Sequence, residues 1–283
     1  TWLSAPVGLA ALVSVAQPLV RLPGHGATAA VVIGVLVVAA LAFVWRRPGP
    51  EPVDDHGMIF RIRRIKLGQL LGSERFEQDG SLDLFLVRHL ASNRVWWNDG
   101  AGTLSDSGQA IGLGFSRHSA TLGDLDGDTD LDAYIPANAP TGTNEVFFNN
   151  GAGVFTNSGH TLGSYSSRAV ALGNVDNKTD LDALIGNNGA NKLWKNNGAG
   201  VFTDSGQAVG TGGTFDVELA DLDGDTDLDA FFANGSTSGD PNEVWLNDGL
   251  GNFTDSGQNL DDDYSFSVVL FHCDGDADLD AFV

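Results

Sequence analysis

The chain has 283 residues, with 15 Lys or Arg against 37 Asp or Glu and a net charge of −22. Residues 1–66 hold seven basic and three acidic side chains, whereas residues 67–283 hold eight and 34. So acidic a region excludes binding to nucleic-acid phosphates, and it suits divalent cations and extracellular or high-salt surroundings.

Residues 1–47 are predicted to form a membrane anchor. Two stretches, about 2–20 and 28–45, are apolar and uncharged, and each approaches the roughly 20 residues that span the hydrocarbon core of a bilayer. The second stretch is the clearer transmembrane helix, because the first contains Pro6 and Pro18. A buried core helix is the alternative interpretation of residues 28–45.

Residues 48–66 are interpreted as a linker, with three prolines followed by the basic run Arg61-Ile62-Arg63-Arg64-Ile65-Lys66. Basic residues directly after a membrane helix favour a cytoplasmic location for that side. Weak calcium sites function instead where Ca²⁺ is abundant, outside the cytoplasm. The calcium loops described below are repeated and chemically specific, so we expect the acidic region to be extracytoplasmic, at the cell surface.

Residues 67–283 form an internal repeat. The motif Asn-x-Val-Trp-x-Asn recurs, with variations, from Asn93, Asn144, Asn191 and Asn242, at intervals of 51, 47 and 51 residues. A period of 40 to 50 residues is typical of propellers and other repeat arrays. The chain stops after half of a fifth unit, so we expect the natural protein to continue.

Each unit contains four short strand patterns and no helical period. In the third unit they cover residues 215–220, 228–233, 243–246 and 252–254. Asn-Asp-Gly at 247–249 favours a tight hairpin turn whose residues need φ > 0. Four antiparallel strands per unit predict an all-β fold, a β-propeller of four-stranded antiparallel blades with about 4.5 repeats present. One aromatic ring recurs at an equivalent strand position in every unit, and we expect these rings to pack between blades: Trp96, Phe147, Trp194 and Trp245.

An acidic loop precedes the second strand of the units. In the complete copies, residues 124–132 and 221–229, carboxylates stand at loop positions 1, 3, 5, 7 and 9, with glycine at position 4. Carboxylates so close together repel one another unless a cation lies among them, and Ca²⁺ binds six to eight such oxygens. A solvated acidic turn is the alternative. The candidate ligands are Asp124, Asp126, Asp128, Asp130, Asp132, Asp221, Asp223, Asp225, Asp227 and Asp229.

Two further copies of the loop are altered. The copy at 272–280 begins with His272 but keeps the candidate ligands Asp274, Asp276, Asp278 and Asp280. The copy at 174–182 has Asn174 at position 1 and Lys178 at position 5. An ammonium group in that loop can replace the ion, so we expect no metal there.

The loop Asp-x-Asp-Gly-Asp-x-Asp-x-Asp followed by Leu-Asp-Ala-Phe resembles the FG-GAP/VCBS repeat family, which includes the propeller of integrin α subunits. The resemblance covers roughly residues 75–283. It implies that each loop joins the first two strands of a blade and binds Ca²⁺, with Asp130 and Asp227 donating their backbone carbonyls. A weaker copy at 75–83 departs from the pattern at Arg75 and Ser81, which leaves metal binding there open.

No catalytic arrangement is recognisable in the sequence, and the lone Cys273 cannot form an internal disulfide. We therefore expect a membrane-tethered, calcium-binding propeller that binds a protein or glycan ligand at the cell surface and is not an enzyme. Two alternatives remain. One is a carbohydrate-active lyase or dehydratase, with its residues in missing blades or in the variable stretches 111–118, 160–167 and 208–215. The other is a purely structural surface component.

Overall fold

The computed structural model describes residues 82–112, 119–139, 142–163, 165–235, 240–261, 263–274, 276 and 278–283, and every regular element in them is a strand. The expected membrane anchor at 1–47 and the linker at 48–66 lie outside the described residues. Within the described part of the chain, no helix is long and apolar enough to cross a membrane.

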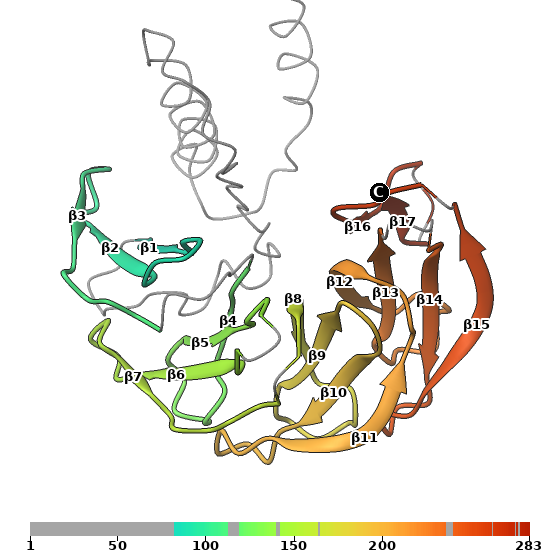
Figure 1. The fold of residues 1–283 in the computed structure, drawn as a ribbon, viewed down its shortest axis with the longest axis horizontal. Helices are drawn as coiled ribbons and strands as arrows, with labels where there is room; N and C mark the ends of the chain where they lie inside the picture. Colours follow the sequence, from blue (N-terminus) through green and yellow to red (C-terminus); the bar gives the residue numbers. More distant parts are fainter. Residues whose placement is uncertain are drawn as a thin grey trace, which may run out of the picture. The chain divides into compact units, whose positions relative to one another are not determined.

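The strands form five antiparallel sheets, each from consecutive strands of one repeat (Figure 1). The first sheet contains β1 (Leu84–Leu86), β2 (Arg94–Asn98) and β3 (Leu104–Asp106). The second contains β4 (Thr121–Gly123), β5 (Asp132–Ile135), β6 (Glu145–Asn149) and β7 (Phe155–Asn157). The third contains β8 (Ser167–Gly173), β9 (Asp182–Asn187), β10 (Asn191–Lys195) and β11 (Thr203–Val209).

The fourth sheet contains β12 (Thr214–Ala220), β13 (Asp229–Asn234), β14 (Asn242–Asn247) and β15 (Phe253–Leu260). The fifth contains β16 (Val269–Phe271) and β17 (Asp280–Phe282). The fourth sheet confirms the four strands expected in the third repeat unit. Its last strand is longer than expected, because after a register shift between Glu243 and Trp245 the pairing resumes and continues to Asn242↔Leu260.

The turn between β14 and β15 has the expected length. It covers residues 248–252, and the expected strands at 243–246 and 252–254 also leave five residues between them. The expected positive φ is present, at 70° for Gly249 and 73° for Gly251. The Asp248 carboxylate closes this turn by accepting hydrogen bonds from the N–H groups of Leu250 at 2.9 Å and Asn252 at 3.1 Å.

The sheets pack face to face in chain order, because successive side chains of a strand point to opposite faces. All of β9 is buried. Its Ala183 and Ile185 pack with Tyr134 of the second sheet, whereas Leu184 packs with Phe232 of the fourth. A middle strand buried on both faces therefore reads as a continuous apolar run.

The recurring rings lie in the cores between sheets, as expected. Phe147 packs in the core shared by the first and second sheets, Trp194 against that of the second and third, and Trp245 against that of the third and fourth. The prediction is confirmed for these three rings.

The first strands of successive sheets lie beside one another and are joined by polar side chains. Between β4 and β8, Thr121 Oγ1 donates to the carbonyl of Val170 at 2.7 Å. Between β12 and the segment leading into β16, Asp216 Oδ2 accepts from Ser267 Oγ at 2.9 Å and from the N–H of Val268 at 3.3 Å. In both places, these hydrogen bonds connect one sheet to the next one in the chain.

Candidate metal centre

The acidic loops connect the first and second strands of their sheets. Residues 124–131 follow β4, residues 174–181 follow β8 and residues 221–228 follow β12, and the carboxylate at loop position 9 begins the next strand. Each loop is therefore anchored at both ends by two neighbouring, paired strands.

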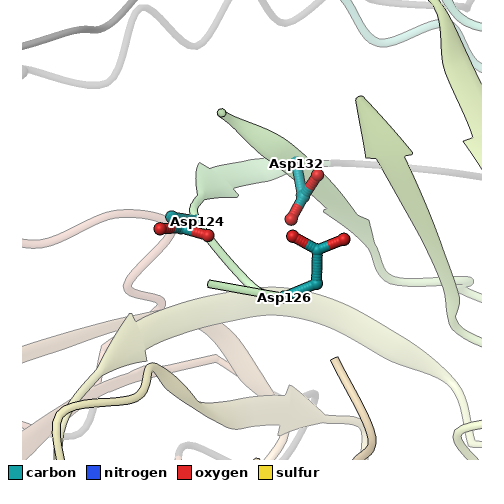
Figure 2. A group of neighbouring side chains, drawn as sticks. All are labelled: Asp124, Asp126 and Asp132. Atoms are coloured by element: carbon teal, nitrogen blue, oxygen red, sulfur yellow. The ribbon is translucent and has the colours of Figure 1, made fainter. Parts of the chain in front are cut away.

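The first complete loop brings three carboxylates together (Figure 2). Asp124, Asp126 and Asp132 each offer an oxygen, and these oxygens lie within 4.8 Å of one another. In the second complete loop the same holds for Asp221, Asp223 and Asp225. Hard oxygen donors grouped at this spacing are the ligand type that Ca²⁺ takes, so the residues fit such an ion.

The backbone of both complete loops folds in the same way around the position 1 carboxylate. Asp124 accepts from the N–H of Gly127 at 2.8 Å and from that of Thr129 at 3.0 Å. The φ of Gly127 is 83° and that of Thr129 is 78°. A positive φ is strained for a β-branched residue, and such strain is concentrated at functional sites.

The carboxylate at position 9 has a structural role as well. Asp132 is 0% exposed, and its two oxygens accept hydrogen bonds from the N–H groups of Leu125 at 2.9 Å and Asn149 at 2.8 Å. Burial raises the pKa of Asp132 to about 7, although the two backbone donors lower it. Asp182 repeats the arrangement, and burial raises its pKa to about 6. Burial also raises the pKa of Asp229.

Other predicted ligands lie outside the three-oxygen clusters of the described residues. Asp128 accepts from the N–H of Asp130 at 2.9 Å. The Asp130 carboxylate lies against the hairpin turn of its own sheet, where a Cβ on Gly151 would approach its Oδ2 to 2.5 Å. Asp227 has the same relation to Gly249. This orientation leaves the position 7 carboxylates directed at the turn.

The loop at 272–280 differs from the complete loops in how its carboxylates are arranged. Among its described residues, Asp274, Asp276, Asp278 and Asp280 do not form a three-oxygen cluster. Its His272 ring lies 2.7 Å from the carbonyl oxygen of Asp278, and Asp280 accepts from the N–H of Cys273 at 2.6 Å. This loop thus keeps the backbone hydrogen bond to the carboxylate at position 9, but its described residues do not group three carboxylate oxygens as a metal site would.

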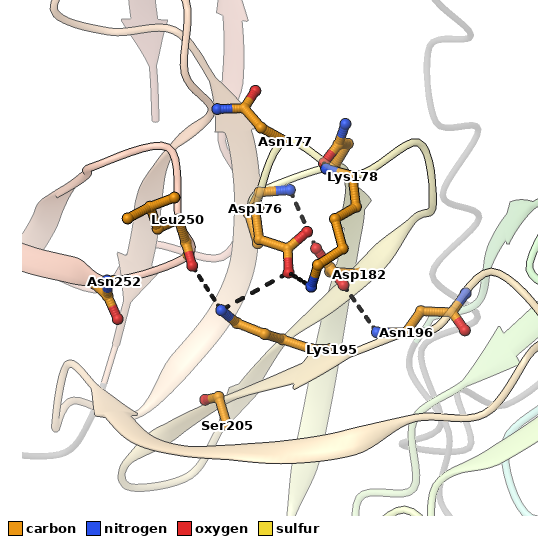
Figure 3. A network of polar contacts seen from close by, with 12 residues as sticks. Asp176, Asn177, Lys178, Asp182, Lys195, Asn196, Ser205, Leu250 and Asn252 are labelled. Atoms are coloured by element: carbon orange, nitrogen blue, oxygen red, sulfur yellow. Dashed lines mark hydrogen bonds and ion pairs between the residues drawn. The ribbon is translucent and has the colours of Figure 1, made fainter.

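The loop at 174–182 contains a carboxylate cluster that the sequence analysis did not identify. Oxygens of Asp176, Asp180 and Asp182 lie within 4.8 Å of one another. The Lys178 ammonium lies 2.5 Å from Asp176 Oδ2, in line with the expected ammonium group in this loop (Figure 3). A second ammonium, that of Lys195 on β10, lies 3.9 Å from the same oxygen.

Lys195 could have been found in the sequence. It stands at the fifth position of the motif Asn-x-Val-Trp-x-Asn, where the other units carry Trp97, Phe148 and Leu246. A cation at a position that is otherwise apolar distinguishes this unit from the other three.

Comparison with known families agrees with this geometry. The family model described as FG-GAP-like repeat matches residues 76–135 and 174–232. Each match starts within one acidic loop and ends in the strand that follows the next loop. The two matched segments are FG-GAP-like repeats, in agreement with the expected resemblance. No curated protein matches the chain.

Proposed function

We propose that the FG-GAP-like repeats of this protein are blades of a β-propeller that binds Ca²⁺ in its loops and presents a ligand-binding surface outside the cytoplasm. The observation that carries the proposal is the carboxylate cluster in each of the loops at 124–132 and 221–229, which share the carboxylates of loop positions 1 and 3. Both loops have the same backbone hydrogen bonds, so a shared role is the simplest explanation.

The stacking of the sheets supports the propeller assignment. Each middle strand contributes alternate side chains to two successive cores, as Phe232 and Phe231 of β13 do. Blades of a propeller require this two-sided burial, because each blade packs on both of its neighbours. A bound Ca²⁺ would neutralise the loop carboxylates, and it would hold the first two strands of a blade together.

Thermal unfolding of the full chain tests the calcium assignment. Saturating Ca²⁺ at about 100 times Kd stabilises the folded state by roughly 2.7 kcal/mol for each site. We expect the melting temperature to rise with added Ca²⁺ and to fall in EDTA, with Mg²⁺ as the comparison ion. A melting temperature that EDTA leaves unchanged would show that the loops bind no structural calcium.

The membrane anchor and the topology are separate parts of the proposal, supported by the uncharged stretch at 28–45. Membrane fractionation followed by protease treatment of intact cells tests both. We expect the acidic region in the membrane fraction and accessible to protease. Recovery in the soluble fraction would contradict the anchor, and protection in both cells and spheroplasts would contradict the topology.

The ligand class is tested by presenting the purified chain to a glycan array and, in parallel, by assaying it for breakdown of the same sugars. Binding without breakdown supports a recognition module. Breakdown would instead favour the carbohydrate-active alternative.

A further inference from the structure

The loop at 174–182 differs from the complete loops in conformation as well as in sequence. Positive φ occurs at Thr129 and Thr226 of the complete loops, but the equivalent Thr179 is not among the described residues with positive φ. The position 1 side chain, Asn174, accepts from the N–H of Lys178 at 3.0 Å instead of from the threonine. This loop therefore has its own backbone arrangement, centred on a lysine.

A second lysine reaches the same loop from β10. In the second sheet, Phe148 packs against the turn of the third sheet, where a Cβ on Gly200 would lie 2.3 Å from its ring and 3.3 Å from Asp126 Cβ. In the third sheet, Lys195 takes that place. A Cβ on Gly251 would lie 2.8 Å from its Nζ and 3.5 Å from Asp176 Cβ. The substitution thus brings a cation beside the loop position 3 carboxylate.

The Lys195 ammonium joins two repeats. Its Nζ donates to the carbonyl of Leu250, in the turn of the fourth sheet, at 2.6 Å and lies 3.9 Å from Asp176 Oδ2 (Figure 3). The Asp176 side chain is only 3% exposed. A carboxylate so deeply buried is costly unless a cation is beside it. The Lys178 pKa is raised by its hydrogen bond to Asp176 and by the charge of that carboxylate, so Lys178 stays protonated at neutral pH.

We infer that Lys178 and Lys195 supply in this loop the positive charge that a divalent ion supplies in the complete loops, and that Lys195 also holds the third and fourth sheets together without metal. The contrast with the other loops rests on the proposed calcium sites, whereas the two ammonium contacts do not. The protein would then have metal-dependent and metal-independent junctions within one series of repeats.

Hydrogen exchange of the full chain, measured by mass spectrometry with and without Ca²⁺, tests the contrast. We expect Ca²⁺ to slow exchange in the loops at 124–132 and 221–229 and to leave 174–182 unchanged. Comparable protection of 174–182 would overturn the inference, because Asp176 Oδ1 and Asp180 Oδ1, which lack hydrogen-bond partners, would then be ligands of an ion.

The variant Lys195→Met tests the ammonium contacts directly, in EDTA. It keeps the aliphatic chain but removes the charge-assisted hydrogen bond, and we expect exchange in the turn 248–252 to accelerate about tenfold. Lys192→Met on the same strand is the control, since its ammonium lies over the Tyr165 ring and away from the loop. Unchanged exchange in Lys195→Met would overturn the inference. If Ca²⁺ slows hydrogen exchange in none of the loops, the proposed calcium binding is wrong. The Lys195→Met variant, measured in EDTA, still decides the role of the lysine in that case.

Discussion

Asn196 Nδ2 donates a hydrogen bond of 2.8 Å to the backbone carbonyl of Leu125, a residue in the acidic loop of the preceding repeat. The same amide donates to the carbonyl of Leu181 in its own loop at 3.2 Å, and the Asn196 N–H donates to Asp182 at 2.8 Å. Asn247 repeats these contacts with Val175, Leu228 and Asp229. In each of these two repeats, one asparagine therefore connects two consecutive loops.

Asn196→Ala is expected to destabilise the protein by about 1–3 kcal/mol, because it leaves the buried carbonyls of Leu125 and Leu181 without their donor. Urea denaturation of the full chain in EDTA measures this loss without a contribution from calcium. The control is Asn197→Asp, which keeps the acceptor oxygen that closes the exposed turn at Ala199 and Val201. An equal stability change in both variants would contradict the role of Asn196.

The acidic loops are expected to contribute unequally to calcium binding. Asp223→Ala or Asp225→Ala removes a carboxylate from a three-oxygen cluster and should abolish one bound Ca²⁺, with its stabilisation of roughly 2.7 kcal/mol at 100 times Kd. Asp176→Ala should change calcium binding much less, because Lys178 already contacts that carboxylate. Titration calorimetry gives the number of ions bound. Asp255→Ala, at an exposed position on β15, is the control, and an equal loss of calcium from the Asp223 and Asp176 variants would contradict the distinction.

Stability without metal is expected to fall as the pH rises. Burial raises the folded-state pKa of Asp132 from 3.8 to about 7, so the folded state holds this proton more tightly than the unfolded state. The favourable contribution is complete below the unfolded pKa and is lost as the pH rises through about 7. Unfolding free energies in EDTA at pH 5 and pH 8 should differ through this group by on the order of 2 kcal/mol.

Asp132→Asn should remove that part of the pH dependence, even though the variant is less stable at every pH. Asp204→Asn removes one carboxylate from an exposed position, and this variant should retain the pH dependence of stability. Ca²⁺ binds the ionised carboxylates, so saturating calcium should weaken the pH dependence of the native protein. A slope that is identical in the two variants would exclude Asp132 as its source.

A glutamine side chain connects one sheet to the turn of the next sheet at two of the sheet interfaces, and it is replaced at a third. We call this pair of hydrogen bonds the glutamine clamp. Gln109 donates to the carbonyl of Gly153 at 2.6 Å and accepts from the N–H of Phe155 at 2.9 Å. Gln207 makes the same pair of bonds to Gly251 and Phe253 in the fourth sheet. The second repeat has His160 at this position, opposite the equivalent residues Gly200 and Phe202.

His160→Gln is therefore expected to stabilise the protein by about 1–2 kcal/mol through two added hydrogen bonds. The reverse exchange, Gln207→His, should destabilise it by a similar amount. Denaturant midpoints of the two variants, measured in the same buffer, check the pair. A loss of stability in His160→Gln would show that this junction is too wide or too differently shaped for the clamp.

Much of the architecture was determined by local pattern. The four strands of the second, third and fourth sheets, the φ > 0 of Gly249 and the packing of Phe147, Trp194 and Trp245 followed from alternation, turn residues and the repeat interval. These features depend on residues close together in the chain, and repetition made each pattern visible several times. The sequence did not show how the turn at 248–252 is closed, because the side-chain hydrogen bonds of Asp248 are not part of a dipeptide preference.

For the acidic loops, too, some features follow from the local sequence and others only from the tertiary structure. Their sequence determined that carboxylates would crowd between two strands, because the spacing of Asp residues is local. The tertiary structure alone decided that Asp132 is held by a donor from β6, that Lys195 reaches Asp176 from β10, and that the same ammonium bonds Leu250 of the next repeat. Such contacts depend on strand register and on how one sheet stacks against the next, and neither is encoded within nine consecutive residues.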